Sequence, residues 1–103
     1  MNPTVPPTHA LRKEAILYKS DGTSQAVQPQ DGQKFGLAEL QQMVGGYIEV
    51  VPLSEGQIMV LNEEGKLRGL AVNREATAVA LPFLGVGDFI VGDALVCDEG
   101  LFD

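Results

Sequence analysis

The sequence predicts one α+β domain, with a small and mostly antiparallel β-sheet and one or two short helices. Three observations lead to this prediction. Short β-prone runs alternate with acidic glycine turns, one apolar stripe has helical spacing, and 103 residues suffice for a single domain. We expect an extended arm over residues 1–10, the domain over 11–97 and an acidic tail over 98–103.

The first predicted element is a β-hairpin. Residues 14–19 and 23–27 are β-prone, and Asp21-Gly22 between them is a common hairpin turn. The preceding arm contains Pro3, Pro6 and Pro7, a pattern that neither a helix nor a central strand accommodates. We therefore expect the arm to be loose and extended.

Residues 35–46 form the clearest predicted helix. Gly36 is an acceptable N-cap with Glu39 at the third helical position, and Gly45-Gly46 supplies a left-handed stop. The apolar side chains recur at helical spacing, at Leu37, Leu40 and Val44. So short a helix is not stable alone, so we expect it to lie on the sheet.

A three-stranded antiparallel meander is predicted next. Its strands are residues 47–51, 57–61 and 66–68, with Pro52 ending the first strand or marking it as a sheet edge. The run 57–61 (QIMVL) is apolar throughout, which predicts burial on both faces of the sheet.

A short helix is expected between Asn73, a favourable N-cap, and Leu81, because Pro82 opposes continuation. Residues 77–81 (TAVAL) fit a strand equally well, so the alternative stays open. The closing strand is expected over 89–91 and 94–97, interrupted by a bulge at Gly92-Asp93.

The charge is unevenly distributed along the chain. Of the formal net charge of −7, residues 1–51 contribute −1 (4 basic, 5 acidic) and residues 52–103 contribute −6 (3 basic, 9 acidic). Such a field repels phosphate backbones and disfavours nucleic acid as a partner. A basic patch in the first half keeps a DNA-associated regulator as an alternative: Arg12, Lys13, Lys19 and Lys34.

Catalytic and metal-binding patterns are missing from the sequence. Cys97 is the only cysteine and His9 the only histidine, so no disulfide framework, transition-metal site or histidine-based triad is expected. The chain lacks a signal peptide, and its longest apolar run is too short to span a membrane. We expect a cytoplasmic, non-enzymatic protein without a cofactor.

One polar cluster suits a small ligand. Asn73 would open a helix whose N-terminus accepts an anion, Arg68 and Arg74 would clamp a phosphate, and Tyr47 would stack on a base. Asn62 and Lys66 complete the cluster. In the alternative, Asn73 is only a cap and the arginines pair with neighbouring acids: Glu63, Glu64 or Glu75.

An ordered set of motifs within residues 46–96 resembles a known family. GYIEVVPL, NEEGKLRGL, N-R-x-A-T and DFIVGDALV follow one another as in the domain of unknown function 3846, found in small bacterial, plasmid and phage proteins. The resemblance implies a mobile-element or prophage setting and a compact mixed fold. It implies no catalytic or binding residue.

The leading functional hypothesis is an accessory protein of a plasmid or prophage that acts through self-association and protein–protein interaction. A thin core with many apolar strand residues predicts an intimate homodimer. The alternatives are a protein that sequesters a phosphate-bearing nucleotide signal and the DNA-associated regulator.

Overall fold

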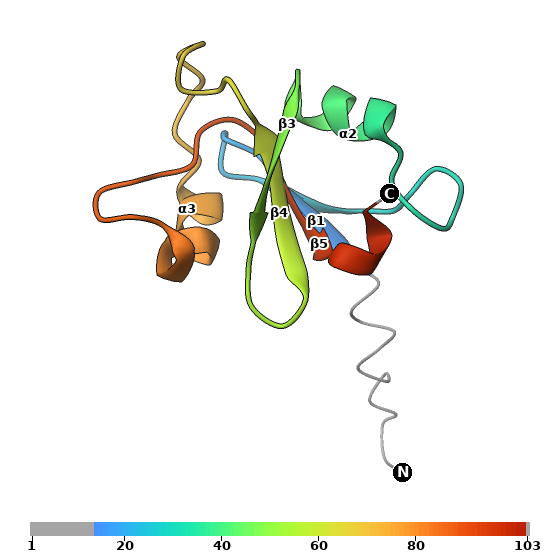
Figure 1. The fold of residues 1–103 in the computed structure, drawn as a ribbon. Coiled ribbons are helices and arrows are strands. Elements are labelled where there is room, and N and C mark those ends of the chain that lie inside the picture. The colour runs from blue at the N-terminus through green and yellow to red at the C-terminus, as the bar shows by residue number, and fades with distance from the viewer. Residues whose placement is uncertain (1–13, 103) are drawn as a thin grey trace.

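The computed structural model describes residues 14–102, which form a five-stranded antiparallel sheet and two α-helices (Figure 1). The predicted α+β fold is confirmed. The predicted arm over 1–10 lies outside the described residues. The elements, including two 3₁₀ turns (η1 and η2), are β1 (Ala15–Tyr18), β2 (Ser24–Val27), α2 (Leu37–Val44), β3 (Ile48–Pro52), β4 (Gln57–Asn62), α3 (Arg74–Ala80), η1 (Leu81–Phe83), β5 (Ala94–Asp98) and η2 (Glu99–Leu101).

The strands lie in the order β2-β1-β5-β4-β3, with every neighbouring pair antiparallel. The β1–β2 hairpin is confirmed. Its turn is held by Asp21, whose Oδ1 accepts hydrogen bonds from the backbone N–H and the hydroxyl of Thr23. β1 and the C-terminal β5 lie side by side at the centre of the sheet, so the two ends of the domain are joined by strand pairing.

The sheet has an apolar core on each face. Ile58 and Val60 of β4 belong to the core under α2, which includes Leu40 and Val44. Met59 and Leu61 belong to the core under α3, which includes Ala76 and Ala80. Because successive side chains of a strand point to opposite faces, residues 58–61 of β4 must all be apolar. The predicted burial of QIMVL on both faces is confirmed.

Helix α2 begins and ends as predicted. The Oε1 of Glu39 accepts a hydrogen bond of 2.9 Å from the backbone N–H of Gly36. Gly45 ends the helix with φ +82°, a left-handed conformation that glycine adopts without steric cost.

Residues 66–68 are not a strand, so this part of the predicted meander is wrong. Residues 63–69 form successive turns, with the backbone N–H of Arg68 donating to the carbonyl oxygen of Glu64 at 2.9 Å. Leu67 is 91% exposed and offers no apolar face to a sheet. The strand that pairs with β4 on its other side is instead β5, which comes from the end of the chain.

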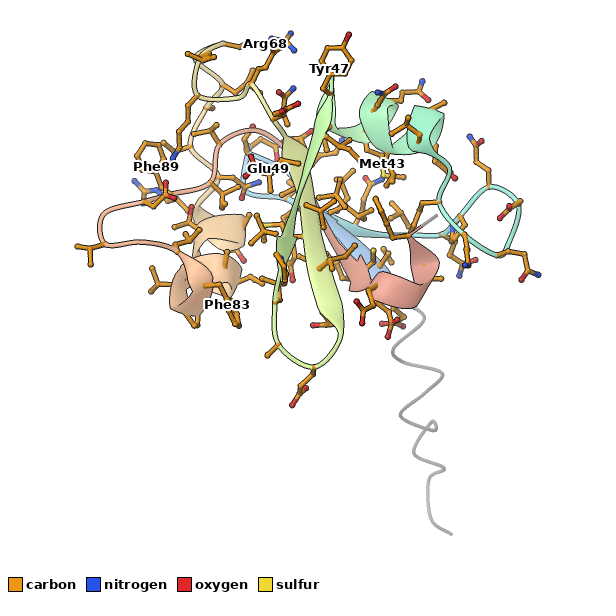
Figure 2. All side chains as sticks on the ribbon, in the orientation of Figure 1. Met43, Tyr47, Glu49, Arg68, Phe83 and Phe89 are labelled. Carbon is orange, nitrogen blue, oxygen red and sulfur yellow. The ribbon has the colours of Figure 1, made fainter. Side chains whose placement is uncertain are left out.

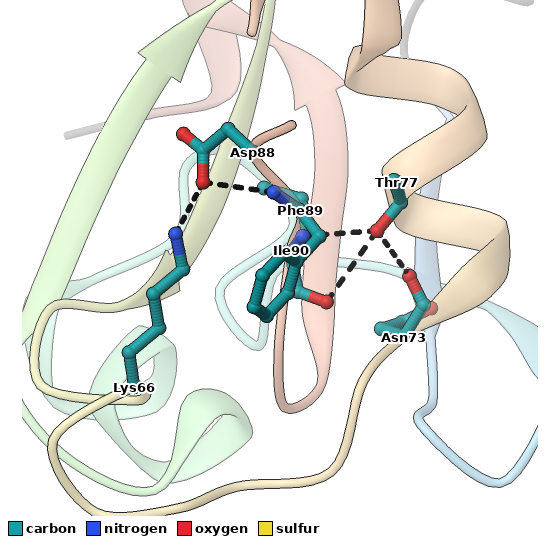
Figure 3. A network of polar contacts seen from close by, with 6 residues as sticks. All are labelled: Lys66, Asn73, Thr77, Asp88, Phe89 and Ile90. Atoms are coloured by element: carbon teal, nitrogen blue, oxygen red, sulfur yellow. Dashed lines mark hydrogen bonds and ion pairs between the residues drawn. The ribbon is translucent and has the colours of Figure 1, made fainter. Parts of the chain in front are cut away.

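The segment that begins at Asn73 is a helix, which decides the open alternative. Asn73 caps α3 by accepting a hydrogen bond of 3.0 Å from the backbone N–H of Ala76. Thr77 secures the helix to the following loop, because its Oγ1 donates to the carbonyl oxygen of Asn73 and accepts from the N–H of Ile90 (Figure 3). Beyond Ala80 the chain continues as η1, with Pro82 in its first turn.

The predicted bulged strand over 89–97 is partly wrong. Val91 forms only an isolated antiparallel bridge with Val72, and the regular strand β5 begins at Ala94. Gly92 has φ +76°, and its N–H donates to the carbonyl oxygen of Ala71 at 2.7 Å. The chain therefore makes a sharp turn here, between a loop and the sheet.

Residues 98–102, which were predicted as part of an acidic tail, pack against the domain. Asp98 ends β5 and caps η2, Leu101 is buried, and Phe102 forms a parallel bridge with Phe35. The tail was predicted from the charge of this segment. Its position is instead decided by the apolar residues Leu101 and Phe102 at its end.

Candidate functional site

Asn62, one of the predicted ligand-binding residues, is a buried structural residue. It ends β4 and is 3% exposed. Its Nδ2 donates to the carbonyl oxygen of Val44 at 3.0 Å, and its Oδ1 accepts from the N–H of Glu64 at 2.8 Å. Asn62 therefore joins the end of α2 to the turn after β4, and both ends of its amide are engaged by the protein.

Asn73 is also structural. It is 0% exposed, and besides capping α3 its Nδ2 donates to the carbonyl oxygens of Tyr18 and Gly92, at 2.9 and 2.8 Å. Both hydrogens of its amide nitrogen and its amide oxygen are therefore engaged by the protein. The reading of Asn73 as a cap agrees with the structure, and the predicted anion site at this helix start has no support in the geometry.

Tyr47 and Arg68 do come together, as Figure 2 shows at one end of the molecule. They line an open cavity of about 220 Å³ whose remaining walls are Gln41, Gly46 and Glu64. Gln41 and Glu64 were not in the predicted site. The signal that could have found Glu64 is its spacing from Arg68, because residues i and i+4 lie on one side of a helical turn.

Arg68 is held against the backbone at this cavity. Its Nη1 donates to the carbonyl oxygen of Gly45 at 2.9 Å, and a Cβ at Gly46 would lie only 3.0 Å from the same nitrogen. The absence of a side chain at Gly46 thus lets the guanidinium approach. Within residues 14–102, no carboxylate lies within ion-pairing distance of Arg68 or Arg74.

Arg74 does not belong to the Tyr47–Arg68 cavity. It is exposed at the first position of α3, and it does not line the cavity walls. The two arginines that were predicted to clamp one phosphate therefore do not lie at the same cavity. The reason is that residues 69–73 lead the chain away from the turn and into α3.

A second concave surface lies between β3 and the loop that precedes β5. It is a groove of about 170 Å³, which we call the β3 groove. Glu49 and Val51 of β3 form one wall, Leu61 of β4 lies between the walls, and residues 88–91 form the other. The sequence prediction did not include this groove, since its walls are 40 residues apart in the chain.

Lys66 lies at the β3 groove in contact with two residues of the opposite wall (Figure 3). Its ammonium pairs with Asp88 and lies 4.6 Å from the centroid of the Phe89 ring. The hydrogen bond from Lys66, together with the N–H of Phe89, lowers the pKa of Asp88. Lys66, predicted as a ligand-binding residue, is thus engaged within the protein.

Strand β3 forms one edge of the sheet. The N–H of Leu53 donates to the carbonyl oxygen of Gln57, and the N–H of Glu63 donates to the carbonyl oxygen of Tyr47. In this register the odd-numbered residues of β3 form the hydrogen-bonded pairs with β4. Because bonded and non-bonded pairs alternate, the backbone groups of Ile48, Val50 and Pro52 point away from the sheet. Within the described part of the chain, no hydrogen bond reaches these outward groups.

Exposed apolar side chains gather in the segment between α3 and β5. Phe83 and Phe89 are 43% and 40% exposed, and Leu81 and Val86 are more exposed still. Figure 2 shows both phenylalanines on the side of the molecule that carries α3. Apolar surface of this kind next to an unpaired strand is typical of a protein–protein contact.

The acidic side chains and the cysteine of residues 14–102 are the candidate metal ligands. Over residues 14–102, no group of three or more His, Cys, Asp or Glu side chains is placed to hold a metal ion. Cys97 is buried at 1% exposure in the core under α2, and this burial raises its pKa to about 11. A thiol in this state is neither a nucleophile nor a ligand at neutral pH.

The family model of the domain of unknown function DUF3846 matches residues 13–101. The chain belongs to this family. The match extends beyond the motifs between residues 46 and 96 and includes the N-terminal hairpin and α2 of this DUF3846 domain.

Neither curated proteins nor solved structures yield a match to this DUF3846 domain. Among residues 14–102, α2 and α3 are both far shorter than a membrane-spanning helix.

Proposed function

We propose that this DUF3846 protein is a non-enzymatic accessory protein of a mobile genetic element that acts through self-association and protein–protein contact. The observation that carries the proposal is the unpaired edge of β3 beside the β3 groove and its apolar rim. An exposed strand edge recruits another strand through its backbone, and neighbouring pockets receive alternate side chains.

The edge is suited to pair with β3 of a second copy. In a two-fold antiparallel arrangement centred on Val50, the N–H of each Val50 reaches the carbonyl oxygen of the other. The N–H of each Ile48 reaches the carbonyl oxygen of Pro52 in the second copy. Every outward N–H of β3 is then used, and Pro52, which has no N–H, serves only as an acceptor.

A shift of this register by one residue is disfavoured by charge. If the pairing were centred on Glu49, the two Glu49 carboxylates would lie directly opposite each other. In the register centred on Val50, each Glu49 instead faces Val51 of the second copy. Glu49 thus discriminates between the two registers that use both outward N–H groups.

The test is the mass of the full chain in solution, measured by sedimentation velocity over a roughly hundredfold range of concentration. We expect the mass to rise from the monomer value of 11.0 kDa towards twice that value. Val50→Lys places a charge on the edge, and Val50→Pro removes an outward N–H without removing a bond of the β3–β4 ladder. Both variants are expected to remain monomeric.

Leu37→Lys is the matched control, because Leu37 is also an exposed apolar residue but lies on α2, away from the edge. It changes the net charge by the same amount and is expected to associate like the parent chain. Circular dichroism establishes that each variant is folded. A parent chain that is monomeric at all concentrations, or a Val50→Lys variant that still associates, would contradict the proposal.

The wider setting is part of the same proposal. A plasmid or prophage origin is the setting that the resemblance of the motifs in residues 46–96 implies, and a cytoplasmic location is supported by the single cysteine, which is buried and free. The non-enzymatic character is supported by the engaged polar side chains of Asn62, Asn73 and Lys66.

A further inference from the structure

The cavity lined by Tyr47, Gln41, Gly46, Glu64 and Arg68, which we name the Tyr47 pocket, is built on a hydrogen-bonded backbone. The turn that carries Glu64 and Arg68 is closed by backbone hydrogen bonds and tied to α2 through Asn62. The carbonyl oxygen of Tyr47 accepts from the N–H of Glu63 at 2.9 Å. The backbone that carries these side chains is therefore held in place before a ligand arrives.

The Tyr47 pocket contains one acidic and one basic side chain that do not form an ion pair with each other. Glu64 and Arg68 both line it, yet their charged atoms are more than 4.0 Å apart, since no ion pair forms between them. One guanidinium nitrogen of Arg68 is used by Gly45, and no other described residue accepts from this guanidinium. A ligand with an acceptor edge and an adjacent donor edge can therefore bridge the two side chains.

Tyr47 adds an aromatic surface to the same pocket. Tyr47 is 65% exposed, more than the exposed aromatic residues Phe83 and Phe89, so its ring is open to solvent. A planar heterocycle stacked on an exposed ring gains contact area that is independent of hydrogen bonding.

We propose that the Tyr47 pocket binds a guanine base. Arg68 donates to the acceptors O6 and N7 of guanine, the pairing that arginine makes most often with this base. Glu64 accepts from the N1–H and the exocyclic amine, and the ring stacks on Tyr47. Adenine is a poorer ligand, because it carries an amine where guanine carries O6 and it lacks the N1–H.

The base, and not the phosphate, is the recognised group. Glu64 lies in the same pocket, the chain carries a net charge of −7, and Arg74 is on another surface. Each of these features weakens the attraction for a phosphate. The proposal does not depend on self-association, because the pocket is formed within one copy.

In the test, the full chain is titrated with guanosine, adenosine and inorganic phosphate. Binding is measured by isothermal titration calorimetry and by changes in the NMR signals of the Tyr47 ring. Guanosine is expected to bind at least about fivefold more tightly than adenosine, and phosphate is expected not to bind. A guanine-containing trinucleotide distinguishes the source of the base. Equal or weaker binding of the trinucleotide indicates a free nucleoside or nucleotide, and tighter binding indicates single-stranded nucleic acid.

Three variants locate the site. Tyr47→Ala and Glu64→Gln are expected to weaken guanosine binding at least about fivefold, the lower end of the effect of losing one stacked ring or one charged hydrogen bond. Arg74→Ala is the control and is expected to bind like the parent chain. Absence of guanosine binding, equal affinity for adenosine, or affinity unchanged in Tyr47→Ala and Glu64→Gln would overturn the proposal. The variant Val50→Lys, which is expected to be monomeric, should bind guanosine unchanged.

Discussion

The amide of Asn73 donates a hydrogen bond of 2.9 Å to the carbonyl oxygen of Tyr18, 55 residues earlier in the chain. The same nitrogen donates to the carbonyl oxygen of Gly92, and the amide oxygen caps α3. One buried side chain therefore joins the end of β1, the turn before β5 and the start of α3.

Replacement of Asn73 should affect stability more than any exposed polar substitution. Asn73→Ala removes the cap and leaves one buried and one partly buried carbonyl oxygen without this donor, so we expect a loss of about 3 kcal/mol in the free energy of unfolding. Asn73→Asp keeps the cap but not the donors and should also be destabilised. Urea unfolding measures both, and the exposed neighbour Arg74→Ala should change stability by less than about 0.5 kcal/mol.

A side chain at Gly92 should destabilise the domain. Its φ of +76° disfavours other residues, and a Cβ there would lie 2.8 Å from Cδ1 of Leu70. Gly92→Ala is expected to lose about 1–3 kcal/mol of stability. Gly85→Ala is the control, since a Cβ at Gly85 meets no atom within 4 Å and φ there is not in the left-handed range. Equal thermal midpoints for the two variants would contradict the crowding at Gly92.

Cys97 should resist alkylation in the native protein. Burial raises its pKa to about 11, so at pH 8 its thiolate population is about two orders of magnitude below that of a free cysteine. We expect labelling by iodoacetamide to be slower by at least this factor and to become rapid in urea. Native labelling as fast as that of the unfolded chain would show that Cys97 is accessible.

Acid should destabilise the protein through three aspartates. The pKa of Asp21 is lowered by the Thr23 hydroxyl, that of Asp31 by the N–H of Gln33, and that of Asp88 by Lys66. A lowered folded-state pKa means that the unfolded chain takes up protons first. The stabilisation is therefore complete above about pH 4 and is lost as the pH falls further.

The pair formed by Lys66 and Asp88 tests this pH dependence. Asp88→Asn should make the urea midpoint less sensitive to acidification below about pH 4, and Lys66→Ala should have a similar effect, because both remove the same pair. Near pH 7 either change should be small, since the two side chains are 53% and 41% exposed. An unchanged acid profile in both variants would contradict the role of this pair.

Self-association should strengthen with salt. Each copy carries a net charge of −7, so two copies repel each other at low ionic strength, whereas pairing of β3 edges relies on neutral backbone groups. We expect the dimer fraction, measured by sedimentation, to increase between about 0.05 and 0.5 M NaCl. Dissociation by salt would instead indicate a contact between opposite charges and would exclude the β3 pairing as the main interface.

The elements that were predicted correctly depend on neighbouring residues. The Asp21-Gly22 turn, the Gly36 and Gly45 ends of α2, and the Asn73 cap are each decided within a few positions of the chain. The errors at residues 66–68 and 89–91 arose where a β-prone run had no local signal about its partner. Strand pairing is decided by segments that are distant in the sequence. Strand β4 pairs with β5 and not with residues 66–68, which follow it in the chain.

The candidate site shows the same division. Of the residues predicted to bind a ligand, Tyr47 and Arg68 meet at the Tyr47 pocket, while Asn62 and Asn73 are buried and bonded to carbonyl oxygens. A polar residue in a sequence does not reveal whether its hydrogen-bonding groups face solvent or the backbone. Folding decides this, because a buried polar group must be satisfied by whichever atoms lie nearby.

The amino-acid sequence was sufficient to predict the α+β class, the position of α2, the N-cap at Asn73, the double-faced apolar character of β4 and the family. These follow from side-chain periodicity and local capping, which act over one or two turns of chain. The tertiary structure alone decided the central place of β5, the exposed edge of β3 and the meeting of Tyr47, Glu64 and Arg68. These depend on contacts between distant segments, whose loop-closure entropy is overcome only when the whole core forms.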